Sequence, residues 1–208
     1  MGVFTLKNLI ILGVPRSGKT TLAKEVIGLF SADNIPVSFL SADSVIGGIT
    51  EIQKNNVLWR VFVRPIRHIV PGLRQQTKKD RIDAMVSFVA RFINETSDVV
   101  PVVYEGAYIA PEIANKIFNK KKCVIVVIGY PNCSVDEKIR DIKKFDKQSP
   151  FIRKPDGQLE TLILGNIERS KKMQKAAEKY GFMFVDTSQK YHQTIKSAAQ
   201  QIYEKLSK

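Results

Sequence analysis

The chain has 208 residues, 44% of them hydrophobic, and carries a formal net charge of +13. This length is enough for one domain with a sizeable core, and no apolar stretch approaches the roughly 18 residues of a membrane span. We therefore expect no membrane partner and no secretory signal. The charge favours anionic partners, but it does not choose between a small phosphorylated molecule and a nucleic acid.

Five short apolar runs, rich in Val and Ile, recur along the chain. They cover residues 7–13, 36–41, 98–106, 123–130 and 182–188. Runs of this length without polar alternation are typical of strands in a parallel sheet that is covered on both faces.

Between these runs, apolar residues recur at helical spacing. The three clearest sets are Ile82, Met85, Val86, Val89 and Ile93; Leu159, Leu162, Ile163, Ile167 and Met173; and Ile195, Ala198, Ala199, Ile202 and Leu206. Alternating strands and helices imply right-handed crossovers and a doubly wound α/β fold. We find no internal repeat or linker, so the sequence predicts a single domain over residues 1–208.

Two segments interrupt this alternation. Residues 44–80 hold the only tryptophan and a cluster of arginines, and residues 131–157 are dense in charge. Within the second segment, Ser134 and Glu137 form an S-x-x-E pattern that predicts a helix start. We interpret both segments as insertions into the domain.

The stretch "LIILGVPRSGKTTLAKEV", residues 9–26, contains the pattern G-x-x-x-x-G-K-T between a predicted strand and a predicted helix. Its glycines allow a tight turn whose backbone N–H groups can point at a phosphate. Lys19 would reach the β- and γ-phosphates, and the Thr20 hydroxyl would bind Mg²⁺. The predicted nucleotide-binding residues are Gly13, Pro15, Arg16, Ser17, Gly18, Lys19, Thr20 and Thr21.

Three acidic residues follow predicted strands, at the edge of a parallel sheet where ligands bind. Glu105 ends an apolar strand, where phosphate-loop proteins orient the Mg²⁺ shell. Asp43 could accept a proton from an attacking hydroxyl or bind magnesium, and a structural role in a turn is the alternative. For Asp186, in "VDTS", an Asx-turn is the favoured interpretation.

Together, these features resemble the small phosphate-loop kinases, the group that holds the adenylate, cytidylate, shikimate and uridine kinases. "EGAYIAPE", from Glu105, is similar to a stretch of 2-phosphoglycerate-kinase-like proteins, and "SADSV", around Asp43, is similar to zeta-toxin-like kinases. The resemblance implies a three-layer α/β/α P-loop NTPase fold with a five-stranded parallel sheet and a nucleoside/nucleotide-kinase-like architecture. Residues 44–80 would then be the acceptor-binding insertion and residues 131–157 the lid.

The resemblance also implies roles for individual residues. Lys19 and Thr20 become the contacts to ATP and Mg²⁺, Asp43 the candidate base, and Glu105 the carboxylate on the magnesium side. The cations available in the lid are Arg140, Lys143, Lys144, Arg153 and Lys154. Arg140 and Arg153 lead among them because a guanidinium can grip two phosphate oxygens. The alternative for each is a solvated basic helix face.

An anionic acceptor would suit the arginines of the first insertion. Arg60, Arg64 and Arg67 would share a face if that stretch is helical, but Pro65 argues against a regular helix. With Asp43 and Glu105 they form the predicted acceptor site, and a surface that serves only solubility is the alternative.

Three functions remain open. The first is an ATP-dependent, cytoplasmic kinase of a nucleoside-like or anionic metabolite, with its two cysteines reduced. The second is a polynucleotide end kinase, which the charge suggests. The third is a nucleotide-dependent regulatory protein, although "NKKK" at residues 119–122 lacks the aspartate of a guanine-binding N-K-x-D. We favour the first, and the sequence leaves the acceptor and the oligomeric state open.

Overall fold

The computed structural model describes residues 6–64, 69–70, 72–96, 100–145 and 155–207. Its centre is a sheet of five parallel strands in the order β2-β3-β1-β4-β5. The strands are β1 (Asn8–Gly13), β2 (Ser38–Ser41), β3 (Val102–Gly106), β4 (Cys123–Gly129) and β5 (Met183–Asp186). The predicted five-stranded parallel sheet is confirmed, and each strand lies within its predicted run.

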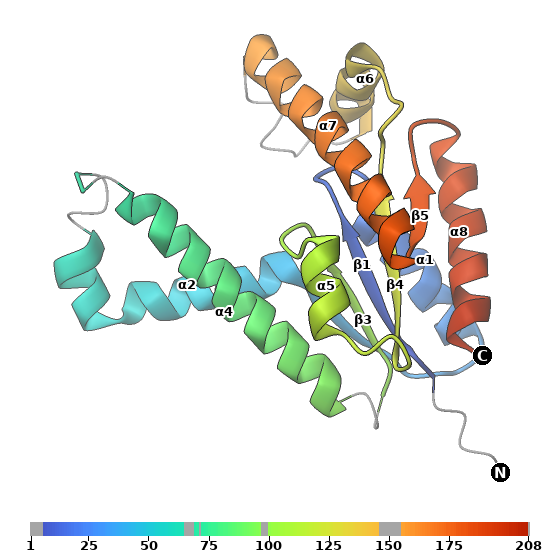
Figure 1. Cartoon of the computed structure of the whole chain (residues 1–208), viewed down its shortest axis with the longest axis horizontal. Helices are drawn as coiled ribbons and strands as arrows, with labels where there is room; N and C mark the ends of the chain where they lie inside the picture. The colour runs from blue at the N-terminus through green and yellow to red at the C-terminus, as the bar shows by residue number, and fades with distance from the viewer. Residues whose placement is uncertain (1–5, 65–68, 71, 97–99, 146–154, 208) are drawn as a thin grey trace.

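Helices cover both faces of this sheet (Figure 1). They are α1 (Lys19–Ala32), α2 (Ala42–Asn55), α4 (Leu73–Thr96), α5 (Pro111–Ile117), α6 (Val135–Phe145), α7 (Asp156–Tyr180) and α8 (Tyr191–Leu206), with a short π-helical turn, η1, at Trp59–Val63. The predicted three-layer α/β/α arrangement is therefore confirmed. None of the described helices is both long enough and apolar enough to cross a membrane.

Alternate residues of β1 pack into two separate cores, because successive side chains of a strand point to opposite faces. Leu9 and Ile11 pack with α1 and α8, whereas Ile10 and Leu12 pack with helices that include α4, α5 and α7. This division explains why β1 is apolar at every position from Leu9 to Leu12. Both cores hold the sheet rigid beneath the loops that follow its strands.

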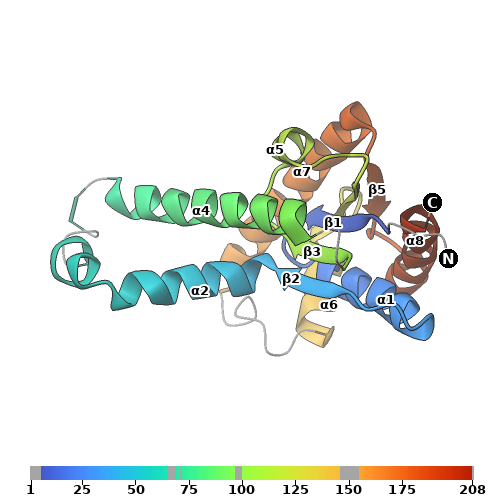
Figure 2. The same ribbon diagram turned by 90° about the horizontal axis from the view of Figure 1, so that it is seen from below.

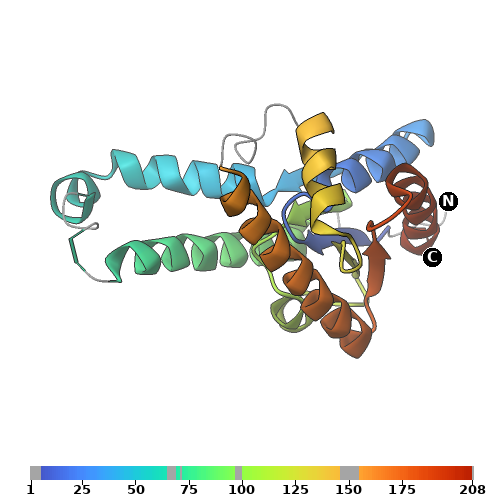
Figure 3. The ribbon, with the colours of Figure 1, turned by 90° about the horizontal axis from the view of Figure 1, so that it is seen from above.

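The first predicted insertion forms a helical arm. Helices α2 and α4 run side by side and project from the body of the domain, as Figures 2 and 3 show from opposite sides. Near the body, α2 and α4 contribute apolar side chains to the same core cluster, and the Arg81 guanidinium donates to the Thr50 hydroxyl over 3.1 Å. The predicted helical set in α4 is buried at Met85, Val89 and Ile93.

The second predicted insertion begins with α6. Ser134 precedes this helix, its hydroxyl accepts the backbone N–H of Glu137 over 3.2 Å, and it donates to the Glu137 carboxylate over 2.8 Å. The predicted S-x-x-E helix start is thus confirmed. Residues 146–154, which include Arg153 and Lys154, lie outside the described residues, and α7 begins after them.

Candidate functional site

The loop between β1 and α1 is held in place by side chains from outside it. The Ser17 hydroxyl donates to the Val14 carbonyl over 2.9 Å, and Thr187, after β5, donates to the Ser17 carbonyl over 3.0 Å. Tyr130, after β4, donates its hydroxyl to the Pro15 carbonyl over 3.0 Å. Carbonyl groups of the loop are therefore fixed before any ligand binds. Such preorganisation suits a loop that cradles an anion with its N–H groups.

Two positions in this loop need glycine for different reasons. A Cβ on Gly13 would lie 2.3 Å from the carbonyl oxygen of Ile128, so the close approach of β4 excludes a side chain. Gly18 has a φ of +101° in the left-handed region, and a Cβ there would lie 2.7 Å from the Tyr191 hydroxyl. Gly13, unlike Gly18, does not have a positive φ, so close packing and not turn geometry requires a glycine at this position.

A buried carboxylate lies where β2 and β3 end. Glu105, 6% exposed, pairs in register with Ser41 at the end of β2. The Glu105 carboxylate accepts the Ser41 hydroxyl over 3.0 Å and the Thr20 hydroxyl over 3.3 Å. The strand order brings these residues together, because β3 lies between β1 and β2. Glu105 and Thr20, the two predicted magnesium ligands, are therefore direct neighbours.

Lys19 lies in the field of both predicted carboxylates. Its ammonium donates to the Val14 carbonyl over 2.9 Å. Burial lowers the pKa of Lys19, while the negative charges of Glu105 and then Asp43 raise it and the nearby Arg169 lowers it. These interactions place Lys19, Asp43 and Glu105 in one electrostatic cluster, as the sequence predicts.

Asp43 lies in the first turn of α2. The Tyr108 phenol lies close to its carboxylate, and burial followed by the negative charge of Asp43 raises the pKa of Tyr108. Close by, the Arg169 guanidinium of α7 donates to the Ala107 carbonyl over 2.5 Å. The segment after β3 therefore places the Tyr108 phenol beside Asp43, and its Ala107 carbonyl binds Arg169 of α7.

A cavity of about 1000 Å³ is lined by Lys19, Thr20, Asp43, Glu105 and Tyr108, among other residues. Its walls come from the phosphate loop and the start of α1, from Asp43, from residues 105–108 at the end of β3 and just after it, from α6, and from the start of α8. The cavity opens at the carboxyl ends of the strands, where ligands bind in parallel α/β folds. Its size suits a nucleotide together with part of a second molecule.

One face of α6 forms a wall of this cavity. Lys138, Asp141, Ile142 and Phe145 line it, and these positions follow the helical spacing of three, four and seven residues. Lys138 is buried with its ammonium 4.2 Å from the centroid of the Tyr130 ring. Burial lowers the pKa of Lys138, and the charges of Cys133 and Asp141 partly oppose that shift. A cation thus faces the cavity from the lid segment.

The predicted lid cations that the structure describes lie elsewhere, and Arg153 and Lys154 are outside the described residues. Arg140, Lys143 and Lys144 are exposed and do not line the cavity. Two of the predicted arginines of the first insertion, Arg60 and Arg64, are exposed at the far end of the arm and do not line the cavity. The third, Arg67, lies outside the described residues. The structure therefore brings together the predicted phosphate-loop residues and two carboxylates, and leaves Arg140, Arg60 and Arg64 apart from them.

The opposite end of the cavity is aromatic. The Tyr191 hydroxyl donates to the Thr21 hydroxyl over 3.0 Å, and the Tyr191 and His192 rings pack edge to face with centroids 5.3 Å apart. Both residues line the cavity beside the start of α1. Flat rings beside the start of α1 suit the base of a nucleotide whose phosphates lie on the loop.

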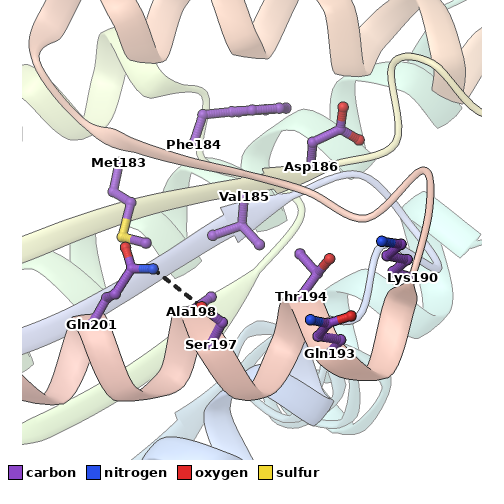
Figure 4. Close-up of a pocket in the computed structure, with 10 residues that line it drawn as sticks. All are labelled: Met183, Phe184, Val185, Asp186, Lys190, Gln193, Thr194, Ser197, Ala198 and Gln201. Atoms are coloured by element: carbon purple, nitrogen blue, oxygen red, sulfur yellow. Dashed lines mark hydrogen bonds between the residues drawn. The ribbon is translucent and has the colours of Figure 1, made fainter.

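Asp186 has the structural role that the sequence favours. Its carboxylate accepts the backbone N–H of Ser188 over 2.8 Å, which is an Asx-turn, and also accepts the amide of Asn132 over 2.8 Å. Figure 4 shows Asp186 at the rim of a second, smaller cavity between β5 and α8, of about 390 Å³. The side chains that line this second cavity are separate from the phosphate loop.

Known structures share this architecture. The shikimate kinase from Acinetobacter baumannii, solved with shikimate, superposes with a TM-score of 0.57 at 16% identity over 98% of this chain and 94% of its own. The gluconokinase from Sinorhizobium meliloti gives 0.51 at 13% identity over 97% and 96%. The protein TT1252 from Thermus thermophilus gives 0.58 at 11% identity over 97% and 98%.

The chain has the fold of the small P-loop kinases. The superpositions cover nearly the whole of both chains. No protein-family profile matches the sequence, and no curated protein matches it. The likeness is thus one of fold, and the chemistry has to be argued from the site itself.

Several residues of the site were not predicted from the sequence, among them Tyr108, Lys138, Arg169, Tyr191 and His192. A signal existed for Lys138, because the apolar residues Ile142 and Phe145 follow it at helical spacing and mark the inward face of α6. Arg169 lies among charged residues of α7 with no pattern that separates it from them. Only its hydrogen bond to the Ala107 carbonyl, which the structure shows, identifies it.

Proposed function

We propose that this protein is a kinase that transfers the γ-phosphoryl group of Mg-ATP to a hydroxyl or phosphate of a small anionic or nucleoside-like acceptor. One observation carries the proposal. A second carboxylate, Asp43, faces the cavity beside the cluster of Lys19, Thr20 and Glu105. Binding a nucleotide needs only the loop and its metal ligands, whereas phosphoryl transfer also needs a group that positions and deprotonates an acceptor.

The residues present fit a magnesium ion. Mg²⁺ prefers oxygen ligands and is usually held by one or two protein groups together with phosphates and water. The Thr20 hydroxyl and the Glu105 carboxylate, 3.3 Å apart, form such a hard-oxygen pair. Among the described residues, no group of three or more His, Cys, Asp or Glu could hold a metal by itself. When bound, the ion would neutralise charge on the phosphates, and Thr20 and Glu105 would hold it.

The protein's own groups then supply binding and proton transfer. The loop and Lys19 bind the phosphates of ATP, and the rings of Tyr191 and His192 flank the base. Asp43 accepts the proton of the acceptor hydroxyl as its oxygen bonds to the γ-phosphorus. The bond from that phosphorus to the bridging oxygen breaks, and ADP leaves. Tyr108 lines the cavity beside Asp43, and its phenol is the neighbouring group that would orient the Asp43 carboxylate.

Two cations support an anionic acceptor. Lys138 lines the cavity on the lid side, and Arg169 is fixed beside Ala107 at the end of β3. The shikimate kinase and the gluconokinase that share the fold act on the acceptors their names state. Hydroxylated carboxylic acids are therefore the first acceptor class to test.

The test is acceptor-dependent release of ADP from Mg-ATP. The panel holds shikimate, gluconate, phosphorylated three-carbon acids, nucleosides, nucleoside monophosphates and oligonucleotides with a 5′-hydroxyl. Lys19→Ala and Asp43→Asn should lose the activity. Their matched controls are Lys24→Ala and Asp83→Asn, which change exposed residues outside the cavity and should retain it.

Two results would contradict the proposal. Turnover that survives Asp43→Asn would remove Asp43 from the chemistry. ATP binding without acceptor-dependent turnover, together with a rate of hydrolysis that changes when a protein partner binds, would favour the regulatory function instead.

A further inference from the structure

Two tyrosine hydroxyls join α8 to α1 at corresponding positions. The Tyr191 hydroxyl donates to the Thr21 hydroxyl over 3.0 Å, and twelve residues further along both helices the Tyr203 hydroxyl donates to the Asp33 carboxylate. This constant separation indicates that the two helices run parallel and in register. Figure 1 shows both helices on the same side of the molecule, they share one core cluster, and the first residues of both line the cavity at the phosphate loop.

The phosphate loop fixes the Tyr191 side chain as well. A Cβ on Gly18 would lie 2.7 Å from the Tyr191 hydroxyl and 2.9 Å from a carbon of its ring, so the ring covers the backbone of Gly18. The His192 ring packs edge to face on the Tyr191 ring. The Tyr191 hydroxyl is therefore held in place from two sides, by the end of the loop and by the first turn of α1.

Thr20 and Thr21 serve opposite ends of the cavity. The Thr20 hydroxyl donates to Glu105, whereas the Thr21 hydroxyl accepts from Tyr191. Successive residues of a helix point about 100° apart, so neighbouring hydroxyls reach different groups. Under the proposed function, the γ-phosphate lies at the Asp43 end and the base lies against Tyr191. The phosphate nearest Thr21 is then the one joined to the nucleoside, the α-phosphate.

We propose that Tyr191 is a positioning residue that directs the Thr21 hydroxyl at the α-phosphate of the bound nucleotide. A hydroxyl has one proton to donate and two lone pairs that accept. Because Tyr191 donates to Thr21, the Thr21 oxygen is held by one lone pair and its proton is left for a phosphate oxygen. Hydrogen bonds to charged oxygens are stronger than those between neutral groups. This inference rests on the nucleotide of the proposed function and adds a residue of α8 to the phosphate site.

A purely structural link between the helices is the competing explanation, and Tyr203 provides its measure. The Tyr203 ring packs edge to face on Phe30 with centroids 5.0 Å apart, and Tyr203 does not line the cavity. Each tyrosine joins α8 to α1 through its hydroxyl, but only Tyr191 has a partner, Thr21, in the cavity lining. Removing one hydroxyl at a time therefore separates ligand binding from stability.

The first test is the binding of Mg-ADP to single variants, measured by isothermal titration calorimetry. Tyr191→Phe keeps the ring over Gly18 and removes only the hydroxyl, and Tyr203→Phe is the matched control on the same helix pair. We expect Tyr191→Phe to weaken Mg-ADP binding roughly five- to ten-fold, as for the loss of one hydrogen bond. Tyr203→Phe should bind within about two-fold of the unchanged protein. Far-ultraviolet circular dichroism checks the folding of both.

The two diastereomers of ADPαS locate the contact, because sulfur replaces one or the other free oxygen of the α-phosphate. Sulfur accepts hydrogen bonds weakly, so the unchanged protein should bind one diastereomer roughly five-fold more weakly than the other. In Tyr191→Phe and in Thr21→Val, this ratio should shrink to within about two-fold. A tyrosine that only stabilises the fold would leave the ratio unchanged, and that result would overturn the proposal.

A double variant tests whether the two hydroxyls act as a unit. If they do, Tyr191→Phe with Thr21→Val should bind Mg-ADP within about two-fold of Thr21→Val alone, whereas multiplied losses would contradict the proposal. Equal affinity of Tyr191→Phe and the unchanged protein would overturn this inference and leave the proposed kinase function standing. Failure of the unchanged protein to bind Mg-ADP would overturn both.

Discussion

Replacing Gly13 by alanine should destabilise the fold and the phosphate loop together. The new Cβ would lie 2.3 Å from the carbonyl oxygen of Ile128 and 2.8 Å from its Cγ2. An ordinary contact between carbon and oxygen is about 3.3 Å, so the backbone of β4 has to move by about 1 Å. Gly13 and Ile128 are paired in register, so this movement strains the ladder between β1 and β4.

Overpacking of this kind costs about 1–3 kcal/mol. For a domain of this size, we expect the midpoint of thermal unfolding to fall by roughly 3–10 °C. ATP affinity should fall as well, because the loop begins at Gly13. Circular dichroism measures the first effect and isothermal titration calorimetry the second.

Gly28→Ala is the matched control. Gly28 lies within α1, and a Cβ there meets nothing within 4 Å. Alanine is better than glycine in a helix by about 1 kcal/mol, so this variant should unfold at a higher temperature and bind ATP normally. If Gly13→Ala unfolds at an unchanged temperature and keeps its ATP affinity, the close approach of β4 is not the reason for a glycine at this position.

Three further variants test the site and the core. Glu105→Gln removes the carboxylate that accepts hydrogen bonds from Thr20 and Ser41, and should lower Mg²⁺-dependent ADP release by roughly 10–100-fold, measured across magnesium concentrations. Burial lowers the pKa of Lys138 in the folded protein below the ordinary lysine value of 10.5. Between these two pKa values the unfolded chain binds more protons at this residue than the folded chain does, so the free energy of unfolding rises with pH in that range. Urea unfolding should show that Lys138→Met lacks this rise. Burial raises the pKa of the Cys123 thiol from 9.0 to about 11. The stabilisation by the buried, protonated thiol is therefore complete below pH 9 and is lost as pH rises through 11. Relative to Cys123→Val, the unchanged protein should lose about 2–3 kcal/mol across that range in urea unfolding, and equal losses in both proteins would contradict the assignment.

The sheet and the phosphate loop could be predicted because their signals are local. A continuous apolar run from Leu9 to Leu12 requires burial on both faces, and Gly13, Gly18 and Lys19 follow it at a fixed spacing. The placement of Glu105 followed from one general rule, that ligands bind at the carboxyl ends of parallel strands. For Asp186, turn chemistry explained the carboxylate without a ligand, and the Asx-turn with Ser188 confirms that interpretation.

Helix α6 and the arm could be predicted only as parts of two inserted segments. Arg140 was preferred to other cations for its guanidinium chemistry, but the direction of a side chain depends on which face of α6 packs against the body. Ile142, buried on that face, turns Lys138 inward and leaves Arg140 exposed. For Arg60 and Arg64, the sequence could not show that α2 continues to Asn55 and carries them away from Asp43. Both cases depend on tertiary packing and on helix length, which spacing alone does not determine.

Tyr130 connects α6 to the phosphate loop through two different groups. Its ring lies under the Lys138 ammonium, and its hydroxyl donates to the Pro15 carbonyl. A cation over a ring is held less strongly than one that pairs with a phosphate by charge-assisted hydrogen bonds. Under the proposed function, a bound phosphate within reach of Lys138 therefore competes with the Tyr130 ring for the ammonium, while the hydroxyl keeps the loop in place. Helix α6 would then respond to the nucleotide while the phosphate loop itself stays fixed.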